Sequence, residues 1–508
     1  MGGALDSDEL AASRAGFQSA GRRLDDPWLA PVRVLPWLGD QLDAVDDMST
    51  AAVAALDASN GVAQAVRSTS LTTSEVDIAT ALTALSAARA ELAEVDVPRS
   101  RWLVGPVLSA REELVASLTE IDATLARFEG LAGAVSLLAS GDHRLLVMSA
   151  NTSEMGSGTG MLLSYGVLTL DSGRLSVSDF ASVDELARPS GVSISDEVRR
   201  LWFNLDPGHE WKYTSHLSSS GTEVARLAGE MFNSLPGDGV DGVIVISPVA
   251  MQNLMVAGKA VPIDVGDRRV PAREVAQFLG TTQYEIAGDA RRVRHQLISP
   301  IATAALSALF DGEADTVELI EALFTSFDER HLVFWSRDDA LQARWEAAGA
   351  DGATAAGSVK VAIANAGGNK LDQFLSVDSN LEQVGPRRFR LSVTVENTAT
   401  GSEGDFVAGD VQPGKYVGYL VATIPGGSLD VTSAGDLPMN AASSDGPTHS
   451  VVALVELDPG ATTSFVVEFT VPVAVGELIV EASGRRPAVR WSIENERVDA
   501  PTPAKISP

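Results

Sequence analysis

The sequence contains no cysteine among its 508 residues, and this absence limits the chemistry open to the protein. A chain without thiols forms no disulfides, has no thiolate nucleophile and binds no metal through sulfur. Proteins that work outside the bacterial cytoplasm often avoid stray thiols, because oxidation there mispairs them. We therefore expect an extracytoplasmic location.

Basic residues are scarce as well. The chain carries 38 Lys and Arg against 68 Asp and Glu, a formal net charge of -30. So acidic a surface repels phosphate backbones, and nucleic acid is therefore not an expected partner. Long apolar runs are also missing: no stretch of about 18 apolar residues is present, so no segment of this chain is expected to span a bilayer.

The motifs of familiar catalytic and metal sites are not found. The six histidines include no pair at i and i+4, and no Gly-x-Ser-x-Gly elbow is present. The glycine-rich residues 156–160 lack the Lys-Ser/Thr ending of a phosphate-binding loop and suggest a flexible strand connection, with an anion-binding nest as the alternative. The sequence thus predicts no catalytic residue, no metal ligand and no cofactor.

The first part of the chain has the period of helices. Apolar residues recur at three- and four-residue steps at Leu114, Leu118, Ile121, Leu125, Phe128, Leu131 and Val135. A second stretch places Ile78, Leu82, Leu85, Leu92 and Val95 on one face, with Ala88 filling the remaining gap. Each seam needs a neighbouring helix to cover it. Residues 1–138 are therefore predicted to form a helical bundle or stalk.

The period changes near residue 144. Short apolar runs at 144–148, 162–170, 174–177 and 243–246 suggest strands, and a long helical segment covers 292–309. Strands that alternate with helices predict a layered α/β domain at residues 139–354.

The last part reads as strands without helices. Phe389, Leu391, Val393 and Val395 alternate with polar residues, and residues 451–457 and 464–471 flank an Asp-Pro-Gly turn typical of a hairpin. This pattern predicts an antiparallel β-sandwich at 355–495, followed by a flexible tail at 496–508. The expected fold class is a multidomain α+β protein.

Four segments resemble the bacterial domain-of-unknown-function 4012 family. They are residues 143–148 with Asn151 and Glu154 and the following 160–166, then 240–250, 331–336 and 365–372. The resemblance implies the outer part of an envelope protein whose membrane anchor is absent from this chain. One departure is Gly156, where the family carries Arg within Glu-Leu-Arg-Pro-Thr-Gly-Gly. Because a guanidinium binds anions bidentately, its loss argues against anion chemistry at this loop.

A second likeness is to the LytR–CpsA–Psr phosphotransferases, which transfer lipid-linked glycans and have a similar α/β layer. Residues 289–296 resemble their Asp-x-Gly-Arg-x-x-Arg-Gln pattern through Asp289, Arg292 and Gln296, with His295 in place of the second Arg. The likeness implies that Arg292 faces a pyrophosphate. The plainer interpretation is a helix start with a solvated basic face.

The sequence therefore favours binding over catalysis. The expected partner is an envelope protein or a cell-wall glycan, and the candidate ligand-binding residues are Asn151, Glu154, Asp289, Arg292, His295, Gln296, Asn369 and Asp372. Residues 365–372 also read as a structural junction, because two Gly and two Asn favour turns. The alternative is a phosphotransferase-like enzyme acting on a polyprenyl-pyrophosphate-linked glycan, with Mg²⁺ and an apolar tunnel in the α/β domain.

Overall fold

The computed structural model describes residues 7–24, 26, 36–68, 75–95, 97, 103–171, 174–190, 192–202, 204–237, 239–265, 268–287, 291–307, 315–409 and 411–506. The chain divides into two compact units. The first comprises Met1–Ser140, Asp315–Glu321 and Ala343–Ala348, and the second comprises Gly141–Ala314, Ala322–Gln342 and Gly349–Pro508.

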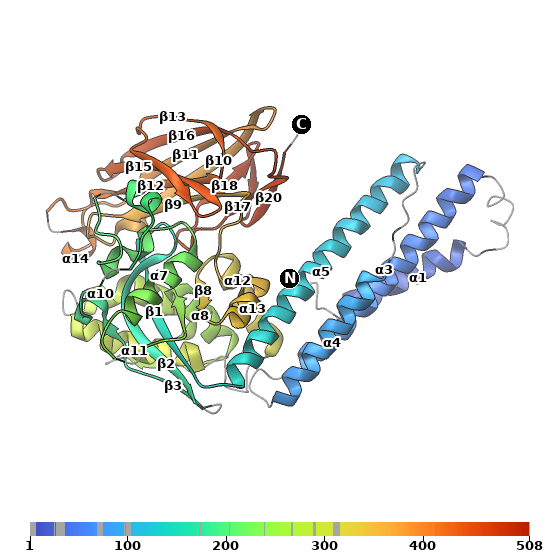
Figure 1. Ribbon diagram of the computed structural model, residues 1–508, viewed down its shortest axis with the longest axis horizontal. Helices are drawn as coiled ribbons and strands as arrows, with labels where there is room; N and C mark the ends of the chain where they lie inside the picture. The colour runs from blue at the N-terminus through green and yellow to red at the C-terminus, as the bar shows by residue number, and fades with distance from the viewer. Residues whose placement is uncertain are drawn as a thin grey trace. The chain divides into compact units, whose positions relative to one another are not determined.

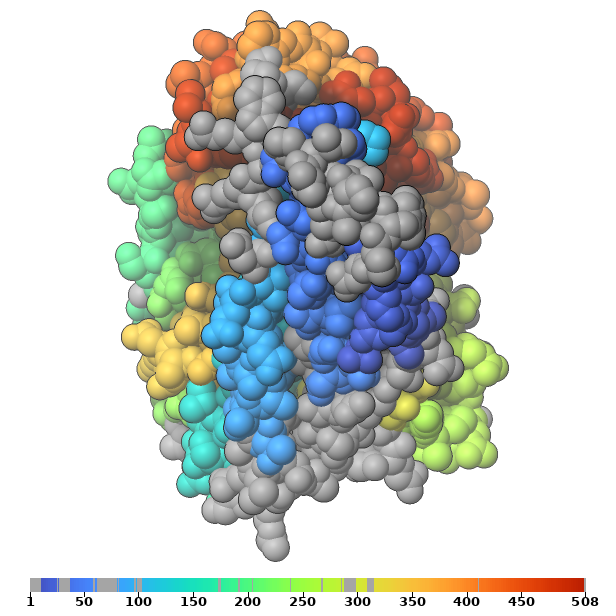
Figure 2. Space-filling view, turned by 90° about the vertical axis from the view of Figure 1, so that its right-hand side faces the viewer, coloured from blue at the N-terminus to red at the C-terminus, as the bar shows by residue number. Residues whose placement is uncertain are grey.

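The first unit is built from long helices: α1 (Ser7–Leu24), α3 (Pro36–Ser68), α4 (Glu75–Ala93) and α5 (Gly105–Ala139). Helix α3 packs against α1, α4 and α5, and α4 also packs against α5. Figure 2 shows α1, α3 and α4 side by side, with α3 in the middle. Of the two predicted seams, Leu85, Ala88 and Leu92 of α4 and Leu125, Phe128 and Leu131 of α5 are buried. The described remainder of the α5 seam, Leu114, Leu118, Ile121 and Val135, is half-buried, as is Leu82 of α4. Among the described residues, no helix has the length and apolar character needed to cross a membrane.

The second unit begins with a mixed sheet in the order β3-β2-β1-β5-β8, with β4 paired to β2. The strands are β1 (His143–Met155), β2 (Gly160–Asp171), β3 (Arg174–Val177), β4 (Ala181–Ser182), β5 (Gly242–Ile246) and β8 (Leu332–Ser336). Strands β1 and β5 are parallel, while β2 and β8 run antiparallel to them. The strands expected at 144–148, 162–170, 174–177 and 243–246 are all present.

Helical segments accompany this sheet in the sequence (Figure 1). They are η3 (Val183–Glu185), α6 (Asp196–Leu201), η4 (Trp211–His216), α7 (Gly221–Asn233), α8 (Pro248–Ala257), η5 (Ala272–Glu274), α9 (Val275–Gln277), η6 (Phe278–Thr282), α10 (Gln283–Ala287), α11 (Arg291–Ser307), α12 (Thr316–Asp328) and α13 (Asp339–Ala348). A separate pair of strands, β6 (Ile263–Val265) and β7 (Arg268–Val270), forms a small antiparallel ribbon. The amphipathic helix α7 packs on β5 and β8, so its apolar side covers that part of the sheet.

Two further six-stranded sheets share one hydrophobic core. One has the order β13-β16-β11-β10-β18-β19 and the other β14-β15-β12-β9-β17-β20. Their bounds are β9 (Ser358–Asn365), β10 (Leu375–Gly385), β11 (Arg388–Asn397), β12 (Tyr416–Pro425), β13 (Leu429–Gly435), β14 (Ala441–Asp445), β15 (Thr448–Leu457), β16 (Thr462–Thr470), β17 (Glu477–Glu481), β18 (Arg490–Ile493), β19 (Glu496–Val498) and β20 (Thr502–Lys505). The predicted alternation in β11 is confirmed, because Phe389, Leu391, Val393 and Val395 are all buried.

The predicted hairpin across the Asp-Pro-Gly turn is wrong. Strand β15 pairs with β12 and β14, whereas β16 pairs with β11 and β13 in the other sheet. A turn of this composition reverses the chain but does not decide which strand becomes the neighbour. Residues predicted as a flexible tail also differ from expectation, since β20 pairs with β17 and buries Ala504.

Strand β9 is buried on both faces. Val359, Val361 and Ile363 enter the core between the two C-terminal sheets. Ala362 and Ala364 enter a second core with Leu146, Val224 and Val243 of the α/β layer. The mixed α+β class is thus confirmed, while the predicted boundary at 354/355 lies within the second compact unit and stays a prediction.

Candidate binding pocket

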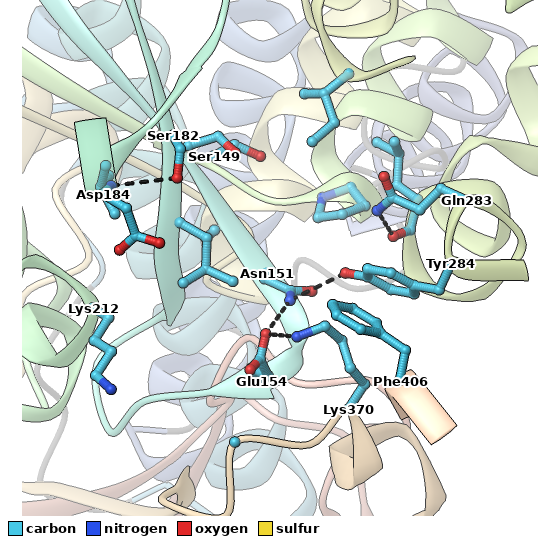
Figure 3. Close-up of a pocket in the computed structure, with 18 residues that line it drawn as sticks. Ser149, Asn151, Glu154, Ser182, Asp184, Lys212, Gln283, Tyr284, Lys370 and Phe406 are labelled. Atoms are coloured by element: carbon cyan, nitrogen blue, oxygen red, sulfur yellow. Dashed lines mark hydrogen bonds and ion pairs between the residues drawn. The ribbon is translucent and has the colours of Figure 1, made fainter. Parts of the chain in front are cut away.

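A pocket of about 280 Å³ lies in the second unit, beside the carboxyl ends of the parallel strands β1 and β5 (Figure 3). Strand β1 supplies Asn151 and Glu154, and Pro248 begins the helix that follows β5. Ligands of α/β sheets often bind at such a crevice, because the loops after parallel strands meet there. The two predicted candidates on β1 are therefore brought to one site.

A buried ion pair forms one wall. The Glu154 carboxylate pairs with the Lys370 ammonium, and both side chains are 8% exposed. Asn151 Nδ2 donates to Glu154 Oε2 at 2.9 Å and lies 3.3 Å from the Tyr284 hydroxyl oxygen. Asn151 is held in turn, because its Oδ1 accepts the Ser153 backbone N–H at 3.1 Å. The pair leaves no net charge on this wall.

Two aromatic rings lie beside the ion pair. The Tyr284 and Phe406 ring centroids are 5.4 Å apart with a tilt of 32°. Lys370 Nζ lies 5.4 Å from the first centroid and 5.2 Å from the second, within range of cation–π attraction. Phe406 comes from α14 (Asp405–Ala408), a short helix between β11 and β12 that the sequence analysis did not expect.

A π-helical turn forms another wall. Segment η6 (Phe278–Thr282) and the following α10 bring Leu279, Gln283 and Tyr284 to the pocket. Gln283 is 4% exposed, and its Nε2 donates to the Leu279 carbonyl. Its Oε1 is buried and has no hydrogen-bond partner among the described residues. Single π-turns are frequent at functional sites, since they redirect side chains within a helix.

The side nearer solvent carries Asp184 and Lys212, which are both exposed. Lys212 Nζ lies 4.4 Å from the Tyr213 ring centroid. The charged residues lining the pocket are therefore Glu154, Asp184, Lys212 and Lys370, two of each sign. Among the described residues that line the pocket there is no arginine, so the field of these residues does not favour an anion.

The glycine-rich loop between β1 and β2 is packed, not flexible as its composition suggested. Ser157 Oγ donates to the carbonyls of His216 and Ser218 at 2.8 and 2.9 Å, and Gly158 N donates to Ser215 O. A Cβ at Gly156 would lie 2.6 Å from the Ser215 carbonyl carbon. A side chain as large as the Arg of the family pattern would therefore collide with η4. Glycine serves close backbone packing here.

The predicted residues Asn369 and Asp372 are buried outside the pocket lining. Asn365 Nδ2 donates to Asp372 Oδ2 at 2.7 Å, and the Tyr416 hydroxyl donates to Oδ1 at 3.2 Å. Burial raises the pKa of Asp372 to about 7. Asn369 Nδ2 donates to Lys415 O at 3.0 Å. These contacts are those of a structural junction, and a ligand role for either residue stays a prediction.

The remaining candidates cannot be placed at the pocket. Asp289 lies outside the described residues, as do the side chains of Arg292, His295 and Gln296, although these three belong to α11. Ile298, farther along α11, lines the pocket. Within the part of the chain that the structure describes, no three His, Asp or Glu side chains gather as metal ligands.

The pocket residues that the sequence analysis did not name as candidates include Gln283, Tyr284, Lys370 and Phe406. Lys370 was visible only as part of the 365–372 motif. Tyr284 lies 133 positions from Asn151, and Lys370 lies 216 positions from Glu154. No spacing rule connects residues so far apart, so only the fold identifies them.

Residues 140–284 match the family described as "Protein of unknown function (DUF4012)". The resemblance predicted from the sequence is thus confirmed over this segment, which contains Asn151, Glu154, Gln283 and Tyr284. The likeness to the LytR–CpsA–Psr phosphotransferases is not shown by the comparisons and stays a prediction. No curated protein and no solved structure matches the chain.

Proposed function

We propose that this chain is the outer part of a membrane-anchored cell-envelope protein, and that its pocket binds a cell-wall glycan without transforming it. The observation that carries the proposal is the pocket lining, in which aromatic rings stand beside amide, hydroxyl and paired charged groups. A binding site needs this inventory of fixed polar groups and apolar faces, but not a nucleophile or a base.

The lining suits a neutral, hydroxyl-rich ring. Ser149, Ser164 and Ser182 can each donate and accept, while Tyr284 and Phe406 offer apolar faces to ring C–H groups. The 280 Å³ volume is close to the lower end of the roughly 300–1,000 Å³ found for small-molecule sites. One sugar ring of a longer glycan fits this size better than an extended lipid does.

The same features disfavour the phosphotransferase alternative at this pocket. Transfer from a polyprenyl pyrophosphate requires several fixed positive groups, with or without a metal, to stabilise the leaving group. Here the Lys370 charge is already paired with Glu154, and the described lining carries as many acidic as basic side chains, Glu154 and Asp184 with Lys212 and Lys370. The pocket also lacks the volume of a polyprenyl tunnel.

The domain layout and the cellular location of the protein belong to the same proposal. We take residues 1–138 as a helical stalk, 139–354 as the α/β domain that supplies most of the pocket lining, and 355–495 as a β-sandwich that adds Gly368, Lys370 and Phe406 to it. The absence of cysteine and the envelope location that the family resemblance implies support a location outside the cytoplasm, with attachment to the membrane. A protein of the envelope is the other partner that this location allows.

The proposal is tested by titrating the purified protein with neutral methyl glycosides and soluble wall fragments, followed by ligand-observed NMR and calorimetry. Tyr284→Ala should weaken glycan binding at least about tenfold, because loss of one buried aromatic contact exceeds about 1.4 kcal/mol.

The matched control is Tyr165→Ala. Tyr165 also belongs to an aromatic pair, 6.1 Å from the Phe232 centroid, but it does not line the pocket. The Tyr165→Ala variant should bind the glycan with the affinity of the wild type. Equal affinity in wild type and Tyr284→Ala, or turnover of a polyprenyl pyrophosphate with Mg²⁺, would refute the proposal.

A further inference from the structure

We infer that the sugar ring taken by the pocket carries an acetamido group, and that Gln283 accepts its N–H. This inference rests on the proposed glycan binding and names the class of sugar. It follows from a buried acceptor without a partner and from the apolar side chains in the same wall.

The acceptor is Gln283 Oε1. The residue is 4% exposed, and this oxygen makes no hydrogen bond to any residue that the structure describes. Figure 3 shows the amide end of Gln283 directed into the pocket. A buried carbonyl oxygen without a donor is costly, so such an atom at a pocket wall marks the place of a ligand donor.

The orientation of the Gln283 amide is determined by its neighbour. Nε2 faces the Leu279 carbonyl, which can only accept a hydrogen bond. Rotating the amide would bring two carbonyl oxygens together, so Oε1 must be the atom left free. Gln283 Oε1 can therefore accept a hydrogen bond from a donor group of the ligand, and it would repel a ligand carboxylate or phosphate.

The choice between an N–H and an O–H donor follows from the surrounding apolar groups. Pro248, Leu279 and Ile298 line the pocket and are buried. A hydroxyl could bond Oε1 but would leave these carbon surfaces without contact. An acetamido group supplies both parts, an N–H for Gln283 and a methyl group for the apolar side chains. Tyr284, the next residue of α10, offers its ring to the sugar face.

The first experiment needs no variant. Three probes are titrated into the wild-type protein: methyl N-acetylglucosaminide, methyl glucoside, and the acetamido glycoside methylated at nitrogen. We expect the first to bind at least about tenfold more tightly than either of the others, because each lacks the N–H donor.

The second experiment compares Gln283→Met with Gln373→Met. Both glutamines donate from Nε2 to a carbonyl of the π-helical turn, Gln283 to Leu279 O and Gln373 to Gly280 O at 3.3 Å, but only Gln283 lines the pocket. Gln283→Met should lose the preference for the acetamido sugar and retain binding of the plain glucoside. Gln373→Met should keep the preference.

The outcomes separate the two ideas. Binding of all three glycosides with equal affinity overturns the acetamido inference and leaves glycan binding in place. Binding of no glycoside by the wild-type protein overturns both. If Gln283→Met still prefers the acetamido glycoside over the plain glucoside, another group of the pocket binds the acetamido substituent. That result would refute the role assigned to Gln283.

Discussion

Lys360 lies in the interior of the second unit, on the central strand β9. Its Nζ donates to the Ser219 carbonyl, and Glu481 is its register partner on β17. Asp445 lies near and accepts hydrogen bonds from Ser218 Oγ at 2.6 Å and Ser219 N at 2.7 Å. Burial lowers the pKa of Lys360 to about 7, against the pull of the nearby carboxylates. A charged side chain is tolerated here, but at an energetic cost.

This cost predicts a pH-dependent stability. Above pH 7 the folded protein holds Lys360 neutral, while the unfolded chain stays protonated up to its ordinary pKa of 10.5. The unfolded state then binds more protons, so the free energy of unfolding should rise with pH between about 7 and 10.5. The contribution of this group is up to about 1.4 kcal/mol per pH unit.

Urea unfolding of wild type and Lys360→Met between pH 6 and pH 10 measures this effect. Above pH 7, the free energy of unfolding of the wild type should rise relative to that of Lys360→Met. The control is Lys415→Met: an ion pair with Glu456 raises the pKa of Lys415, so it should change no slope in this range. Parallel curves for wild type and Lys360→Met would show that Lys360 keeps its charge in the fold.

At the scale of elements, helix α5 depends on two glycines. A Cβ at Gly130 would lie 2.6 Å from Ala348 N and 2.8 Å from Arg344 O, and one at Gly133 would meet the Arg344 side chain. Arg127 Nε donates to Ala348 O at 3.1 Å in the same region. The segment Ala343–Ala348 therefore approaches α5 closely, within the first unit. The apolar seam of α5 predicted a bundle of neighbouring helices but not this contact.

Gly130→Ala should destabilise the protein by about 1–3 kcal/mol, because the backbone of Ala343–Ala348 cannot easily move away. Gly16→Ala is the matched change in another helix. A Cβ there meets nothing within 4 Å, so it should stabilise α1 by up to about 1 kcal/mol through helix propensity. Denaturant unfolding followed by circular dichroism distinguishes the two. Equal stability of Gly130→Ala and wild type would mean that this close packing is absent in solution.

For the molecule as a whole, residues 352–358 show how the α/β layer and the C-terminal sheets are tied within the second unit. Gly352 O accepts from Gly221 N at 2.8 Å and from Arg330, whose guanidinium also bonds Ala353 O at 2.8 Å. Arg330 pairs with Glu481 of β17, and the Arg330 and Glu481 side chains are 10% and 7% exposed. A stretch rich in Gly and Ala is thus held at several points, although its composition is that of a linker.

Limited proteolysis with an enzyme that cuts after small residues tests this attachment. Native protein should resist cutting at 352–358, even though Ala355 and Ala356 are exposed, because cleavage requires local opening. Arg330→Ala should make this stretch the first site cut, since it leaves Glu481 buried without its cation. Arg388→Ala, which removes an exposed partner of Glu468, should be cut by the protease at the same positions and rate as the wild type. Rapid cutting of the wild type here would favour separate domains.

Some residues of the candidate site could be predicted from the sequence, and the others are identified only by the fold. Asn151 and Glu154 were candidates because they belong to a short continuous segment that resembles the family pattern. Tyr284, Phe406 and Lys370 complete the pocket from α10, α14 and the start of the C-terminal sheets. Their contacts depend on packing between distant segments, which no local pattern encodes.

The sequence by itself determined the elements that depend on neighbouring residues: the seams of α4 and α5, the alternation of β11 and the apolar strand β5. Side-chain period follows directly from backbone geometry, so these could be predicted from composition and spacing. Tertiary structure alone decided which sheet β15 and β16 join, and which carboxylate pairs with Lys370. Those choices are made by burial of whole surfaces, and they depend on contacts between segments that are not neighbours in the chain, such as Glu154 and Lys370, which lie 216 positions apart.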